Sequence, residues 1–76
     1  MSDESRETRD KAAEGYETAA AELERAAARL KTTARHFREG DVPRGCAHAW
    51  AAHGNVLAAD RLLEELAELH ATKAQA

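Results

Sequence analysis

The sequence predicts an all-α fold, an antiparallel two-helix hairpin that self-associates into a four-helix bundle. Ala, Leu, Glu and Arg dominate the composition, whereas the β-branched and aromatic residues typical of strands are scarce. Apolar residues recur with a helical period on both sides of one short break. That break, "FREGDVPRGC" at residues 37–46, holds the only proline and two of the four glycines. We therefore expect residues 1–76 to form a single domain with one bend.

The first helix is predicted at about residues 5–38, because apolar side chains recur there every seven residues in three adjacent columns. The large column consists of Tyr16, Leu23, Leu30 and Phe37. The first small column consists of Ala12, Ala19, Ala26 and Thr33, and the second of Ala13, Ala20, Ala27 and Ala34. The opposite, solvent-facing side is expected to carry Glu14, Glu22, Arg25, Arg29 and Arg35. Small columns beside a large one predict close helix packing.

The bend is predicted at residues 39–42. Gly40 suits the left-handed conformation that often follows the last helical residue. Asp41 suits the N-cap of the next helix, and Pro43 suits its first turn, where no N–H is needed. A connection this short brings the second helix back alongside the first as an antiparallel hairpin.

The second helix is predicted at about residues 42–72, with a flexible tail at residues 73–76. Its main apolar stripe consists of Ala47, Ala51, Gly54, Ala58, Leu62, Leu66 and Leu69. A second flank carries Cys46, Trp50, Leu57 and Leu63. Gly54 costs a helix interior about 1 kcal/mol relative to Ala. Two interpretations explain it: close helix packing at Gly54, or a break in the helix at "HGN".

One hairpin cannot bury all of these side chains, because each helix offers only one strip to the other. The residues expected in the core and the subunit interface are Tyr16, Leu23, Leu30, Phe37, Trp50, Leu57, Leu62 and Leu66. An apolar surface left over in this way usually marks association, so we expect a homodimer. The alternative is a different protein partner that covers the same surface.

Charge predicts how the hairpins pair. Residues 25–56 carry six basic and two acidic residues, a net charge of +4. Residues 1–24 carry a net charge of −5 and residues 57–76 a net charge of −2. Both segments lie at the open end of the hairpin, where the two chain termini are. An antiparallel dimer places each bend beside the open end of the other copy, so opposite charges meet. The competing interpretation is that these charges only solvate the helix faces.

Net charge, hydropathy and cysteine count indicate where the protein is expected to reside and which partners it is not expected to bind. The formal net charge of −3 argues against non-specific nucleic-acid binding. The polar first ten residues lack a signal-peptide core, and no apolar run is long enough to span a membrane. A single cysteine forms no internal disulfide. We therefore expect a soluble cytoplasmic protein.

Two sets of residues are candidates for ligand binding. Cys46 and His53 share a face of the second helix, and His36 lies across the bend, so the three are a candidate transition-metal site. His48 is expected to point elsewhere. Arg35, Arg38 and Arg44 near a helix N-terminus are a candidate anion site. The structural alternatives are that Cys46 is a buried hydrophobic residue and that the arginines are only solvated. Apart from a metal we expect no cofactor.

The stretch "ARHFREGDVPRGCAHAWAAHGNVLAADRLLEEL" resembles small helical-hairpin domains of unknown function in archaea, and the HEPN helical module. The likeness is carried by Gly40, Asp41, Ala47 and Gly54 and covers about half of the chain. It implies a helical hairpin and dimerisation. HEPN ribonucleases use an Arg followed after a short spacer by His at a dimer interface, which Arg29 and His36 resemble, with Leu30 where that family has a polar residue.

We accordingly expect an oligomerising interaction or accessory module rather than an enzyme. The alternatives are a metal- or ligand-binding bundle that uses Cys46 and the histidines, and an HEPN-like RNA-processing module. The native mass of the protein tests the oligomerising module, and its metal content tests the metal-binding bundle.

Overall fold

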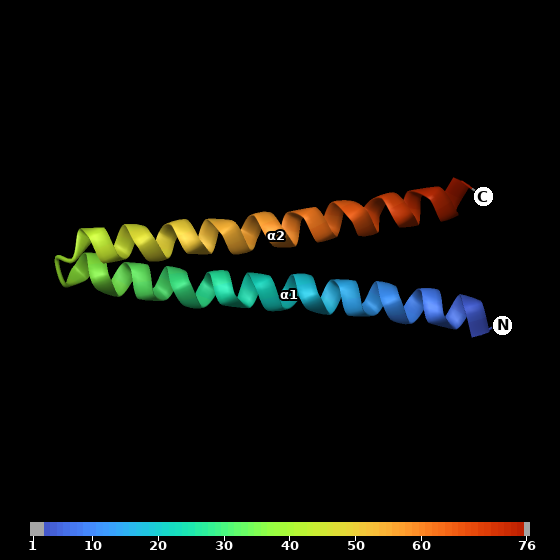
Figure 1. Cartoon of the computed structure of the whole chain (residues 1–76), viewed down its shortest axis with the longest axis horizontal. Helices are drawn as coiled ribbons and strands as arrows, with labels where there is room; N and C mark the ends of the chain where they lie inside the picture. The colour runs from blue at the N-terminus through green and yellow to red at the C-terminus, as the bar shows by residue number, and fades with distance from the viewer. Residues whose placement is uncertain (1–2, 76) are drawn as a thin grey trace.

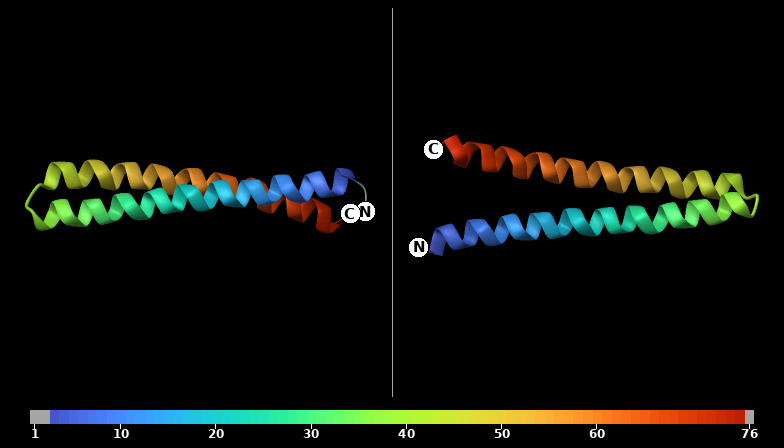
Figure 2. Two further views of the ribbon diagram at one scale, coloured as in Figure 1. Left: turned by 90° about the horizontal axis from the view of Figure 1, so that it is seen from below. Right: turned by 180° about the vertical axis from the view of Figure 1, so that it is seen from behind.

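The structure, a computed structural model, describes residues 3–75 and the side chains of residues 5–69. It contains two long helices, α1 (Asp3–Arg38) and α2 (Val42–Gln75), which run antiparallel and pack side by side (Figure 1). They lie closest at the bend and diverge toward the chain ends, where they cross in the view turned by 90° (Figure 2). The all-α hairpin predicted from the sequence is thus observed.

Both helices are slightly longer than expected. α1 begins at Asp3 instead of near residue 5. α2 continues to Gln75, so residues 73–75 are helical where a flexible tail was expected, and Ala76 lies outside the described residues. Ala, Lys and Gln are good helix formers, and no Gly or Pro follows Thr72 to end the helix. α2 also runs without interruption through "HGN", so the predicted break there was wrong.

The bend forms as the capping residues predict. Gly40 has a φ of +84°, and its N–H donates to Phe37 O at 3.1 Å. The N–H of Asp41 donates to His36 O at 2.8 Å, and this pair of bonds is a Schellman motif. Asp41 then caps α2, since its Oδ1 accepts from the N–H of Arg44 at 3.3 Å, and Pro43 sits in the first turn.

Small residues line the contact between α1 and α2, which we call the inner seam. The buried hydrophobic residues of the described chain are Ala19, Ala26, Ala52, Ala59 and Leu66. Gly45, Ala52, Ala59 and Leu66 recur every seven residues along α2 and face the first small column of α1. Gly15 makes room for Leu66, because a Cβ there would lie 3.1 Å from a Leu66 methyl carbon. Close approach of the two helices therefore excludes large side chains from most of this seam.

Few of the residues predicted for the core and the subunit interface are buried within a single hairpin. Of the residues predicted there, Leu66 is buried and Leu62 is half-buried, whereas the large column, Trp50 and Leu57 remain exposed. Close packing at Gly54 is also absent, since no atom of the described chain beyond its own helix neighbourhood lies within 4 Å of a Cβ placed there. The close approaches occur at Gly15 and Gly45, where Phe37 leans over the glycine. Ala47 and Gly54 themselves are exposed, whereas Leu66 of the same predicted stripe packs against α1.

The hairpin is only one layer thick. Its Cα extents are 57 × 20 × 12 Å, and the smallest extent combines the roughly 5 Å width of one helix's Cα trace with the crossing of the two helices in Figure 2. The Cα radius of gyration is 17.3 Å, against about 11 Å for a globular chain of this length. Within the described residues, neither helix contains a segment long and apolar enough to cross a membrane.

Candidate association surface

A central polar network crosses the inner seam and joins α1 to α2. Asn55 donates from Nδ2 to Glu22 Oε2 at 2.7 Å and accepts at Oδ1 from Arg29 Nη1 at 2.8 Å. Arg29 also donates to the Ala51 carbonyl oxygen at 3.4 Å, and Arg25 pairs with Glu22 at 2.5 Å. Glu22 and Arg29 were expected on the solvent face, so this part of the register was wrong. Because both partners of Asn55 are charged, the network favours one alignment of the helices.

Two histidines extend the inner seam toward the bend. The rings of His36 and His48 stack with centroids 5.3 Å apart and an interplanar angle of 19°. His48 thus points away from the side of α2 that carries Cys46 and His53, as expected, and meets His36 of α1. His36 Nδ1 lies 3.9 Å from Glu39 Oε2 and makes no hydrogen bond among the described residues.

α1 carries a second seam that α2 leaves partly exposed, formed by the large column and the second small column. In sequence order these residues alternate at spacings of three and four: Ala13, Tyr16, Ala20, Leu23, Ala27, Leu30, Ala34 and Phe37. This spacing is the coiled-coil pattern of a packed helix face. Tyr16, Leu23, Leu30 and Phe37 are 41–51% exposed, and Ala13, Ala20 and Ala27 are also exposed. We call this surface the outer seam of α1.

α2 carries a matching apolar face. Its outer column consists of Val42, Ala49, Val56 and Leu63, of which the three large members are 41–48% exposed. Trp50, at 77% exposure, leans on His53 with ring centroids 5.7 Å apart. Leu57 lies one heptad after Trp50 and is also exposed. The α2 face is therefore broad and apolar, with His53 and Asp60 as polar interruptions.

The outer seam of α1 and the outer column of α2 lie on the same side of the hairpin. Each large residue stands four positions after an inner-seam residue, as Leu23 follows Ala19 on α1 and Val56 follows Ala52 on α2. Two antiparallel helices are related by an approximate two-fold axis perpendicular to the hairpin plane, so equivalent positions emerge on one face. The contact of Phe37 with Gly45 across the seam agrees with this placement. We call this the apolar face.

The other candidate sites do not assemble. Cys46 and His53 are exposed on the outer side of α2, whereas His36 lies in the inner seam. Within the described residues no group of three or more His, Cys, Asp or Glu side chains converges as metal ligands would. The interpretation of Cys46 as a buried hydrophobe was also wrong, since the thiol is exposed.

The basic residues of the bend have local structural partners. Arg44 Nε lies 3.4 Å from Asp41 Oδ2, within the cap of α2. Arg35 and Arg38 occupy the last turn of α1, where cations interact favourably with the helix dipole. Arg44 therefore has an ion-pair partner within the bend, and Arg35 and Arg38 complement the dipole of α1.

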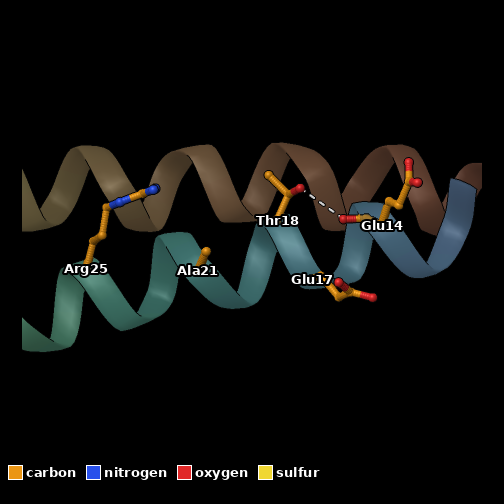
Figure 3. Close-up of a pocket in the computed structure, with 5 residues that line it drawn as sticks. All are labelled: Glu14, Glu17, Thr18, Ala21 and Arg25. Atoms are coloured by element: carbon orange, nitrogen blue, oxygen red, sulfur yellow. Dashed lines mark hydrogen bonds between the residues drawn. The ribbon is translucent and has the colours of Figure 1, made fainter.

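A shallow depression lies on α1 alone, lined by Glu14, Glu17, Thr18, Ala21 and Arg25 (Figure 3). The Thr18 hydroxyl donates to the Glu14 carbonyl oxygen at 2.9 Å, one turn earlier in the helix. Because α2 contributes no residue to the lining, this depression is a feature of one helix surface and not a cleft of the fold.

Arg29 and His36, the pair that resembles the HEPN motif, both face α2. Arg29 is exposed and bonded to Asn55 of α2, whereas the half-buried His36 stacks on His48, so each side chain already has a partner across the inner seam. No protein-family model, curated protein or solved structure matches the chain. The apolar face is therefore the feature from which function can be argued.

A second heptad series in the sequence would have located the inner seam. Asp41, Gly45, His48, Ala52, Asn55, Ala59, Leu62 and Leu66 follow the same three-and-four spacing, with a small residue at most alternate members. Weighting residues by hydrophobicity hides this series, because Asp41, His48 and Asn55 are polar. Asn55, which joins the two helices, was considered only as a helix breaker.

Proposed function

We propose that this chain is a self-associating interaction module, in which two hairpins pack through their apolar faces into a four-helix bundle. The observation that carries the proposal is an apolar face spread over both helices of a molecule one layer thick. Domains generally consist of at least two packed layers around a core. A second hairpin supplies the missing layer.

The exposed area supports the same conclusion. The accessible surface is 5857 Å², whereas a globular monomer of 8.3 kDa exposes about 4,600 Å². The excess is about 1,300 Å² per chain, which exceeds the roughly 800 Å² per partner of a standard protein interface. The hairpin thus has enough surface to form a stable dimer.

The role that follows is structural: the bundle presents its outer surfaces to further partners, and no catalytic step is assigned to it. Its inner seam is filled by alanines and by polar side chains that bond to one another. The apolar face supplies the association energy, because surface charges contribute little to affinity.

Native mass spectrometry of the purified chain tests the proposal. We expect a species of twice 8.3 kDa with no added mass, in equilibrium with monomer on dilution. A monomer of 8.3 kDa at every concentration, with full helical content, would contradict self-association and leave a different protein as the occupant of the face. An excess mass that is lost on unfolding would instead support the ligand-binding alternative.

A further inference from the structure

The outer seam of α1 is complementary to itself in shape. A column of four alanines runs beside a column of four large side chains along the same helix face. When two such faces meet antiparallel about a two-fold axis, the alanine columns lie against each other and the large columns pack against each other beside them. Small residues at alternate positions let helix backbones approach closely, as they do in the inner seam.

α1 is also complementary to itself in charge. Its residues 3–24 carry eight acidic and three basic residues, a net charge of −5, and residues 25–38 carry five basic residues and none that is acidic. The column at the edge of the outer seam shows the same division: Asp10, Glu17 and Glu24 are followed by Lys31 and Arg38. Reversal of one helix on the other therefore places each acidic half against a basic half.

From this face we infer that α1 of a second copy packs antiparallel on the outer seam of α1. The inference rests on the proposed self-association and specifies which helices meet and in what register. Tyr16 lies opposite Phe37 of the second copy, and Leu23 opposite Leu30 of the second copy. In this register Glu17 approaches Arg38 of the second copy and Glu24 approaches Lys31 of the second copy.

The competing two-fold arrangement places the bends together and seats α1 on α2 of the second copy. It places residues 3–24, with a net charge of −5, beside residues 59–75, with a net charge of −2. It also places residues 25–38, with a net charge of +5, beside residues 42–58, with a net charge of +1. Like charges then meet at both ends, which disfavours this arrangement.

Oxidation of the native Cys46 distinguishes the two dimer arrangements without any substitution. It is exposed and lies nine residues before Asn55, which is level with the middle of α1. At about 1.5 Å rise per residue, the antiparallel dimer places its two Cys46 residues roughly 27 Å apart along the axis. A disulfide needs Cα atoms within about 7 Å. The bend-to-bend dimer places the two thiols at the same end.

Engineered cross-links give a positive test in a C46A background. Ala20→Cys and Ala34→Cys lie on the second small column, on opposite sides of the middle of α1. When the two variants are mixed and oxidised, we expect the mixed disulfide dimer to dominate, while each variant alone resists cross-linking. Circular dichroism confirms that both variants keep their helices, and the mass of the unoxidised variants establishes that they associate.

The outcomes separate the inference from the proposed function. A dimeric chain without the mixed disulfide, or a wild-type dimer that oxidises readily through Cys46, overturns the antiparallel α1 pairing and leaves self-association standing. A chain that stays monomeric overturns both. The mixed disulfide together with a wild-type dimer that does not oxidise establishes the arrangement.

Discussion

Truncation of the two central leucines of the large column separates association from hairpin folding. Leu30 is 51% exposed and Leu23 is 44% exposed in the hairpin, so neither contributes much to the inner seam. Full burial of a leucine side chain contributes about 1.5–3 kcal/mol, and roughly half of that remains to be gained in the dimer. Each leucine occurs twice in a symmetric dimer. The double variant Leu23→Ala/Leu30→Ala should therefore weaken dimerisation by about 4 kcal/mol, or roughly 1,000-fold in Kd.

Sedimentation velocity over a dilution series measures this loss, with circular dichroism at each concentration to follow helix content. Alanine keeps the helix propensity of the replaced leucines, so any change reflects the lost contacts. The matched control is Thr18→Ala/Thr32→Ala, which truncates the same helix on its other flank and should leave the Kd unchanged. A double leucine variant with wild-type Kd would refute the reasoning that the large column is the dimer contact.

Four further substitutions test the account of the hairpin itself, with thermal and urea unfolding as the measurement. Gly54→Ala should stabilise the hairpin by about 1 kcal/mol, because alanine has the higher helix propensity and displaces no neighbour; a destabilised variant would show that this position is closely packed. Gly40→Ala should destabilise the hairpin, because the φ of +84° at this position is strained for any residue with a Cβ. Asn55→Ala should cost about 1–2 kcal/mol, because two charged partners lose their hydrogen bonds across the inner seam, and an unchanged midpoint would show that the network adds no stability. Thr33→Val should stabilise by about 1 kcal/mol, because the buried Thr33 hydroxyl has no hydrogen-bond partner among the described residues, and a loss of stability would reveal one.

The sequence predicts the hairpin well because its local signals agree. Gly40, Asp41 and Pro43 each favour the conformation found at the bend, and each acts within a few residues of its own position. Helix propensity and periodicity are equally local. The helices and the turn between them could therefore be located without knowledge of tertiary contacts.

The choice of seam could not be predicted in the same way, because it depends on which columns fit together. α1 offers three apolar columns, and hydrophobicity favours the column of large residues for the core or the subunit interface. In the structure Ala19 and Ala26 form the contact, since close backbones leave no room for leucines. Polar neighbours such as Glu22 and Asn55 are accommodated because they bond to each other across the seam. Hydrophobicity alone therefore does not show which column of α1 forms the contact with α2.

Small-angle X-ray scattering tests the central claim most directly, because it gives mass and shape together. Two hairpins packed face to face, with helix axes about 8–10 Å apart, double the mass but raise the radius of gyration only from 17.3 Å to about 18 Å. We predict a mass of twice 8.3 kDa with this nearly unchanged radius. A mass of 8.3 kDa, or a doubled mass with the radius of about 33 Å that end-to-end hairpins would give, would contradict association through the apolar face.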